Sequence, residues 1–193
     1  INPAKEPGLV KFAVPKSPVS LITGGTEIAS EYLQPHIGTD YLLLQGIAKA
    51  VLAQGRTDAL FIDKHTAGFD NYVEQLKSLS WDVVVTCGIR KETIEHIAKV
   101  YGESSNTIFA WGMGVTHHVH GVENVEQIAN LALLRGMVGK PSAGILPLRG
   151  HSNVQGIGTI GVKPVLAQDV LRNMSQYFGV ELPKSKGLDT MSS

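Results

Sequence analysis

Ten residues from Pro147 to Gly156 carry the side chains best suited to binding a charged ligand. The segment PLRGHSNVQG contains one arginine, one histidine, two carboxamides, one hydroxyl and two glycines. Arginine presents a planar fork of donors that matches a carboxylate or a phosphate, and glycine lets the backbone approach a ligand closely. A polar turn between two elements would use the same residue types. The segment therefore indicates either an anion site centred on Arg149 or a plain solvated turn.

Two further segments have the composition of ligand-binding turns. Gly112-Met113-Gly114 follows the apolar run Asn106–Trp111, and ligands bind at the carboxyl ends of strands in open α/β sheets. Gly38-Thr39-Asp40 precedes a helical pattern, so backbone amides there would favour an anion. The Asp40 carboxylate could instead accept hydrogen bonds from an N–H-rich edge such as guanine. A tight turn and a plain N-cap are the structural alternatives.

Three histidines, His117, His118 and His120, raise the question of a metal site. On a strand, His118 and His120 would share a face and His117 would oppose them. Glu123 is the only close carboxylate, and no cysteine nearby completes a zinc pattern. A metal-binding cluster, imidazoles that donate to a bound ligand, and simple surface residues all stay open.

The composition is that of an ordinary globular protein. Of 193 residues, 43% are apolar and 18% are charged, and 17 cationic residues balance 17 anionic ones. No basic surplus indicates nucleic acid, and no apolar run approaches the roughly 18–20 residues of a membrane span. We expect neither a nucleic-acid partner nor a membrane segment, and a cytoplasmic location by default. Cys87, the single cysteine, cannot ligate an iron–sulfur cluster alone and is expected to be a buried small residue.

The apolar periodicity predicts helices that alternate with short strands. Helices are predicted at 40–54, 68–79, 91–101, 122–137 and 168–178, and strands at 81–85 and 106–111. Residues 59–63 fit a strand or the start of a helix, and 140–161 looks irregular. A strand, a glycine-rich turn and a helix in succession predict an α/β fold. We expect an open, mostly parallel sheet with flanking helices, a Rossmann-like dinucleotide-binding domain whose first strand could be truncated.

One domain is expected over 1–193. Residues 1–38 are rich in proline and glycine and predict a loop-rich opening segment with one or two short strands. Residues 183–193 predict a flexible tail. The chain starts at Ile1 without a methionine, in a pattern typical of a strand that ends in a turn. We therefore expect a fragment whose upstream part has been removed, with N-terminal processing as the alternative.

Taken in order, several segments resemble the molybdopterin oxidoreductases, and in particular the formate-dehydrogenase-like alpha subunits. The segments that carry the resemblance are Trp111–Thr116 (WGMGVT), Asn130–Gly136 (NLALLRG), Gly139–Pro141, Ala143-Gly144, Leu148–Gly156, and upstream Ile1–Gly8, Tyr32–Asp40 and Lys64–Phe69. Essentially the whole chain is covered. The resemblance implies an internal cofactor-binding domain of a large catalytic subunit, with bis-molybdopterin guanine dinucleotide holding molybdenum or tungsten. The rest of that parent subunit is then a partner, and an electron-transfer partner and an iron–sulfur cluster ligated outside this chain are compatible with it.

The resemblance also assigns residues. Gly38, Thr39 and Asp40 match the turn at a guanosine end of the cofactor, and Gly112, Met113, Gly114 and His117 match the loop that lines the pterin. Gly150, His151, Ser152 and Asn153 complete the expected cofactor-binding set. Arg149 matches the catalytic arginine that stands beside the metal and orients a small anionic substrate such as formate.

Two features separate this chain from well-known formate dehydrogenases. His151 stands where those enzymes usually have glutamine. The family's metal-ligating cysteine or selenocysteine lies upstream of the matching region, so this chain alone is expected to be inactive. A non-catalytic nucleotide-binding α/β module remains the alternative function.

Overall fold

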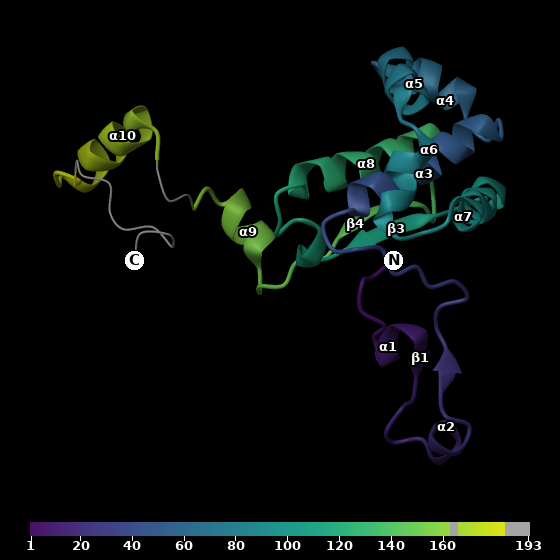
Figure 1. Cartoon of the computed structure of the whole chain (residues 1–193). Helices are drawn as coiled ribbons and strands as arrows, with labels where there is room; N and C mark the ends of the chain where they lie inside the picture. Colours follow the sequence, from purple (N-terminus) through teal and green to yellow (C-terminus); the bar gives the residue numbers. More distant parts are fainter. Residues whose placement is uncertain (163–165, 184–193) are drawn as a thin grey trace. The chain divides into compact units, whose positions relative to one another are not determined.

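A computed structural model describes residues 1–162 and 166–183 of the chain (Figure 1). The chain divides into two compact units, Ile1–Leu148 and Arg149–Ser193. The predicted tail lies, from residue 184 onward, outside the described residues. In the part of the chain that is described, no helix has both the length and the apolar character needed to cross a membrane.

The opening segment contains four very short elements. Helix α1 (Pro7–Val10) leads into β1 (Lys11–Phe12), and helix α2 (Pro18–Ile22) precedes β2 (Thr26–Glu27). The two strands pair antiparallel, with Lys11 opposite Glu27. Helix α2 forms because Pro18 fits the first turn and the Ser17 hydroxyl accepts from the Ser20 amide at 3.3 Å.

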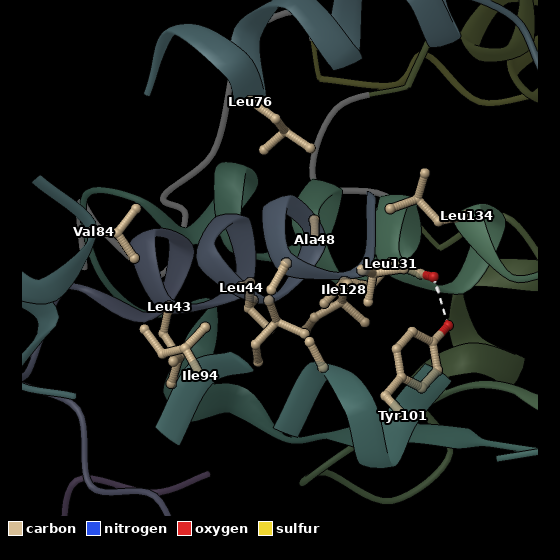
Figure 2. Packing of buried hydrophobic residues seen from close by; sticks show 14 of the residues in the cluster. Leu43, Leu44, Ala48, Leu76, Val84, Ile94, Tyr101, Ile128, Leu131 and Leu134 are labelled. Carbon is tan, nitrogen blue, oxygen red and sulfur yellow. Dashed lines mark hydrogen bonds between the residues drawn. The ribbon is translucent and has the colours of Figure 1, made fainter. Parts of the chain in front are cut away.

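Helix α3 (Asp40–Ala53) is the centre of the first unit. It confirms the helix predicted at 40–54, and its apolar residues are buried on more than one face. It packs against α7 (Lys91–Glu103) and α8 (Gly121–Leu134), which confirm two further predicted helices. Figure 2 shows side chains of α3 among those of α7 and α8. Burying a leucine such as Leu43 contributes about 1.5–3 kcal/mol, so this three-helix contact dominates the core.

Three α-helices and one 3-10 helix lie between α3 and α7 in the sequence. Helix α4 (Ala59–His65) shows that 59–63 starts a helix, and α5 (Phe69–Ser78) confirms the helix predicted at 68–79. The strand predicted at 81–85 is wrong, because these residues form α6 (Trp81–Val84) and the 3-10 helix η1 (Val85–Cys87). The Ser80 hydroxyl accepts from the Val83 amide and starts α6, and Val84 is fully buried.

Glycine at position 46 permits the close approach of α3 and α6. A side chain at Gly46 would place its Cβ 2.5 Å from Cγ1 of Val84 and 3.4 Å from Cγ2 of Ile94. Cβ atoms do not approach other carbons that closely in well-packed interiors. The backbone of α3 therefore lies directly against side chains of α6 and α7.

Strands β3 (Ile108–Trp111) and β4 (Gly144–Pro147) form a parallel pair on the same unit. Ile108 lies opposite Gly144, and Trp111 lies opposite Pro147. Helix α8 connects the two strands, as a parallel pair requires. The predicted α/β class, with a parallel sheet and flanking helices, is confirmed, although this sheet has two strands among the described residues.

The region predicted to be irregular, 140–161, contains β4 and the short helix α9 (Val154–Thr159). Glycine and proline at both ends of β4 hid the strand from the sequence pattern. Helix α10 (Gln168–Phe178) matches the helix predicted at 168–178. Both α9 and α10 belong to the second unit.

Candidate functional site

The loop after β3 leaves its backbone open to a ligand. The chain passes from β3 through Gly112 into the 3-10 helix η2 (Met113–Val115). A Cβ at Gly112 or Gly114 would meet no atom within 4 Å, and the Met113 side chain is 38% exposed. The first residues of any helix also have N–H groups without intrahelical partners. The loop can therefore offer backbone donors and an uncrowded surface to a planar ring system.

The Met113 carbonyl fixes the shape of this loop. It accepts from the amides of Thr116 and His117 at 3.1 and 3.0 Å and from the Thr116 hydroxyl at 2.9 Å. His117 consequently follows directly on the glycine turn, with its side chain exposed. Hydrogen bonds to the Met113 carbonyl thus hold Gly112, Met113, Gly114 and His117 in one compact loop.

Two of the three histidines are in contact: the ring centroids of His118 and His120 lie 6.3 Å apart, and the His120 amide lies 3.2 Å from Nδ1 of His118. His117 is exposed, and the Nε2 of His118 lies 2.6 Å from the Nδ2 of Asn124. The ring centroid of His120 lies 4.5 Å from that of Tyr41, with the ring planes tilted by 38°, and its Nδ1 lies 3.7 Å from a Glu123 carboxylate oxygen. Within residues 1–162 and 166–183, no three His, Cys, Asp or Glu side chains are grouped as metal ligands.

The turn before α3 is anchored to η1. The His36 amide donates to the Cys87 carbonyl at 2.8 Å, and the His36 ring packs so closely on Gly88 that a Cβ there would lie 2.7 Å from Nε2. Gly38 has a φ of +87°, in the left-handed region that glycine adopts without strain. The Thr39 hydroxyl donates back to the His36 carbonyl at 2.7 Å and makes no capping bond to α3.

Asp40 remains available in this arrangement. It is half-buried in the first turn of α3, and its carboxylate makes no hydrogen bond to any described residue. A carboxylate at a helix N-terminus is stabilised by the helix dipole and keeps its acceptor capacity. Two oxygens in one plane match the adjacent N1–H and N2 amine donors of guanine.

The Tyr41–His120 contact joins the two turns. Tyr41 follows Asp40 directly, and His120 lies between the strand-end loop and α8. Their ring centroids are 4.5 Å apart, so the starts of α3 and α8 lie side by side. Segments about 75 residues apart in the sequence, both predicted to bind the cofactor, are therefore neighbours in the first unit.

The arginine loop opens the second unit. Arg149, Gly150, His151, Ser152 and Asn153 are all exposed and run in succession into α9. The guanidinium of Arg149 and the ring of His151 make no hydrogen bond or ion pair to a described residue. Asn153 has a φ of +54°, and a Cβ at Gly156 would collide with the Asn153 amide. The Asn153 side chain thus occupies the space that a side chain at position 156 would need, which explains the glycine there.

Two residues that position the loops were missed by sequence reasoning. Asn124 is fully buried and Tyr41 is partly buried against the core. A signal for Asn124 was present, since it lies four residues before Ile128 on the apolar face of α8. An amide in that position needs a specific polar partner.

Comparisons with known proteins agree with the sequence pattern. Residues 3–185 match the family model described as molybdopterin oxidoreductase. The whole chain is 36% identical to an uncharacterized oxidoreductase of Mycobacterium tuberculosis and 37% identical to protein YdeP of Escherichia coli. It covers 26% and 27% of these proteins, so the chain spans about a quarter of their length.

One more distant relative and one solved structure carry names that mention a reaction. A putative formate dehydrogenase of Bacillus subtilis, YrhE, is 35% identical over 83% of the chain, which covers 17% of that protein. The solved structure of acetylene hydratase from Pelobacter acetylenicus superimposes with a TM-score of 0.57 over 64% of this chain and 19% of that one. The identity in that alignment is 18%, so this similarity concerns the fold alone.

Proposed function

The chain belongs to the molybdopterin oxidoreductase family, and on that premise we propose that it holds bis-molybdopterin guanine dinucleotide within a larger catalytic subunit. The observation that carries the proposal is the Tyr41–His120 contact, which makes neighbours of the Gly38–Asp40 turn and the Gly112–His117 loop. A dinucleotide cofactor needs one site for its base and another for its reactive end, within reach of each other. Family membership by itself supports binding of a molybdopterin. The proposal that the cofactor carries guanine rests on Asp40.

The residues present fit such a cofactor. In the proposed arrangement Asp40 accepts hydrogen bonds from guanine, while the open backbone at Gly112 and Gly114 lies against the pterin. The exposed His117 ring can donate to a ring nitrogen or a phosphate oxygen. When bound, the group supplies two-electron redox chemistry at molybdenum or tungsten.

Arg149 is the proposed catalytic residue for a small anionic substrate. A guanidinium is always charged and binds a carboxylate through two parallel hydrogen bonds. It would hold the anion in one orientation and stabilise charge that develops during oxidation. Gly150 and His151 to Asn153 would complete the contacts around it. Formate is the proposed substrate of the parent, and the name of the Bacillus subtilis relative supports this choice.

Cofactor analysis of the intact protein tests the proposal. Purified protein is expected to contain molybdenum or tungsten and to release two equivalents of GMP per metal on acid hydrolysis. Protein that is active yet free of both metals would refute the proposal. Metal without GMP would refute the guanine dinucleotide form.

Asp40→Asn tests the guanine site, and Asp70→Asn is its matched control. Both carboxylates lie in the first turn of a helix two residues after a left-handed glycine, so their effects on helix stability are similar. Loss of a charged acceptor is expected to weaken guanine binding about 10–100-fold, equivalent to about 1.5–3 kcal/mol. Equal cofactor retention in the two variants would exclude a role for Asp40.

Arg149→Lys tests the substrate site, and Arg172→Lys on α10 is its control. Lysine keeps the charge and loses the fork, so formate turnover is expected to fall on the order of 10²-fold with the cofactor retained. Arg172 is also exposed and belongs to the same unit, and its variant is expected to match the wild type. Unchanged turnover in Arg149→Lys would remove the arginine from the mechanism.

A further inference from the structure

Asn124 is a fully buried amide in the first turn of α8, and it holds the strand-end loop. Its Nδ2 donates to the Val115 carbonyl at 2.7 Å and lies 2.6 Å from Nε2 of His118. Removing an amide from water is unfavourable unless hydrogen bonds compensate it. Both contacts that compensate Asn124 come from the loop, so one side chain holds two points of the segment 115–118.

The orientation of the Asn124 amide follows from these partners. Rotated by half a turn, it would place Oδ1 against the Val115 carbonyl oxygen, and two acceptors would face each other. Nδ2 therefore directs both of its hydrogens at the loop, and Nε2 of His118 accepts one of them. The His120 amide points at the other ring nitrogen of His118, Nδ1, at 3.2 Å. A neutral imidazole has one acceptor nitrogen. Because the Val115 carbonyl fixes the orientation of the Asn124 amide, we assign that acceptor to Nε2, and the longer His120 contact is then not a hydrogen bond.

Packing alone does not account for an amide at position 124. Its Oδ1 is buried and has no hydrogen-bond partner among the described residues. An unpaired buried acceptor is destabilising, and an apolar side chain of similar size would avoid that cost. The two donor contacts to the loop are what an asparagine provides and a leucine does not.

A close backbone contact supports the same connection. A side chain at Gly121, the first residue of α8, would collide with the Thr116 carbonyl oxygen. The loop is therefore pressed against the start of α8 by backbone packing and tied to it by Asn124. His117 lies between Thr116, which packs on Gly121, and His118, which contacts Asn124. Its own amide donates to the Met113 carbonyl.

We propose that Asn124 is a positioning residue, which acts through Val115 and His118 to hold Gly112–His117 in the conformation that receives the pterin. The identity of the ligand, the pterin, rests on the proposed function. The role of Asn124 in fixing the loop does not depend on it. A loop fixed before binding loses less conformational entropy when the ligand arrives. Asn124 touches no ligand in this scheme, and its effect is on the shape and rigidity of the loop.

Asn124→Asp tests the proposal in the intact protein, because aspartate has the same shape and cannot donate to the Val115 carbonyl, a loss that no change of the His118 tautomer can restore. Tyr72→Phe is the matched control: it removes a partly buried 2.7 Å side-chain hydrogen bond to α8, from Tyr72 to Gln127, away from the loop. Amide hydrogen exchange of residues 113–118 is measured on cofactor-free protein, and the rate of pterin release on loaded protein. We expect Asn124→Asp to raise both about tenfold or more, and Tyr72→Phe to change neither.

The outcomes separate the two proposals. Unchanged exchange over 113–118 in Asn124→Asp overturns the positioning role whether or not the protein binds pterin. Faster exchange with unchanged pterin release overturns the link between the loop and the cofactor. Wild-type protein that binds no pterin refutes the proposed function. Amide hydrogen exchange of residues 113–118 still tests the role of Asn124 in that case. If Asn124→Asp does not fold, His118→Leu, at a half-buried position, removes one of the two contacts and gives the same readouts.

Discussion

The hydroxyl of Tyr101 on α7 donates a 2.7 Å hydrogen bond to the Leu131 carbonyl oxygen on α8 (Figure 2). Leu131 begins the last turn of α8, where four carbonyls have no intrahelical partner. The other three accept backbone amides: Ala132 from Met137, Leu133 from Gly136 and Leu134 from Asp58. Every carbonyl at this buried helix end is therefore satisfied, and one of them by a side chain.

Replacing Tyr101 with phenylalanine leaves the Leu131 carbonyl without that donor. The variant is expected to lower the free energy of unfolding by about 1–2 kcal/mol, the cost typical of an unpaired buried acceptor. Urea denaturation followed by circular dichroism measures it. Tyr177→Phe is the control, because its ring is 85% exposed and it should leave the midpoint unchanged. A Tyr101→Phe midpoint equal to that of the wild type would contradict the expectation.

Alkaline pH is expected to destabilise the first unit through Tyr101, which is buried, and Tyr72, which is partly buried. Burial raises the pKa of Tyr101 and of Tyr72 above the ordinary value near 10. A weaker effect lowers each pKa: the Arg135 charge acts on Tyr101, and a hydrogen bond with Asn130 acts on Tyr72. A raised pKa in the folded state means that the unfolded chain loses its proton first. Stability is therefore complete well below pH 10 and falls above it, by at most about 1.4 kcal/mol per pH unit for each tyrosine. Urea titrations from pH 8 to 11 should show this fall, and Tyr101→Phe should make it less steep.

Gly121→Ala is expected to disturb the contact between the strand-end loop and α8. The new methyl group meets the Thr116 carbonyl, a backbone atom that cannot turn away. Overpacking of this kind costs about 1–3 kcal/mol. Gly8→Ala is a suitable control, since a Cβ there meets nothing within 4 Å. Thermal unfolding of both variants checks the prediction, which fails if the two melting temperatures shift equally.

Cys87 is expected to resist thiol reagents until the protein unfolds. Its side chain is 0% exposed, and burial raises the pKa of the thiol, so the reactive thiolate is scarce. Labelling with a chromogenic disulfide should be slow in native conditions and rapid in urea at about 6 M, a concentration on the order of that needed for full unfolding. Ser105→Cys, at an exposed position, supplies the rapid comparison within the same chain. Fast labelling of native wild-type protein would contradict the burial of Cys87.

Long periodic segments were predictable from the sequence, and short or non-local ones were not. The helices at 40–54 and 168–178 have three or more turns, so their apolar spacing is distinctive. Residues 81–85 are too few to distinguish a helix from a strand, and the cap at Ser80 decided the outcome. Strand β4 exists because β3 pairs with it, a partner that local pattern cannot reveal.

The candidate site divides in the same way. Gly112–Gly114 and Gly38–Asp40 were predictable because turn residues at the end of a strand or the start of a helix have a local signature. Their proximity was not predictable, since it depends on the contact of Tyr41 with His120. The role of Asn124 required the position of His118, which only tertiary structure supplies.

The register of β3 with β4 has a consequence for how the chain folds. Each pair in this register joins residues 36 positions apart, and α8 occupies the interval. Closing so long a loop is entropically costly in an unstructured chain, whereas a preformed helix shortens the distance that must be searched. We expect α8 to dock on α3 first and the strands to pair late. The glycine loop at the end of β3 would then be among the last parts of the first unit to reach its native shape.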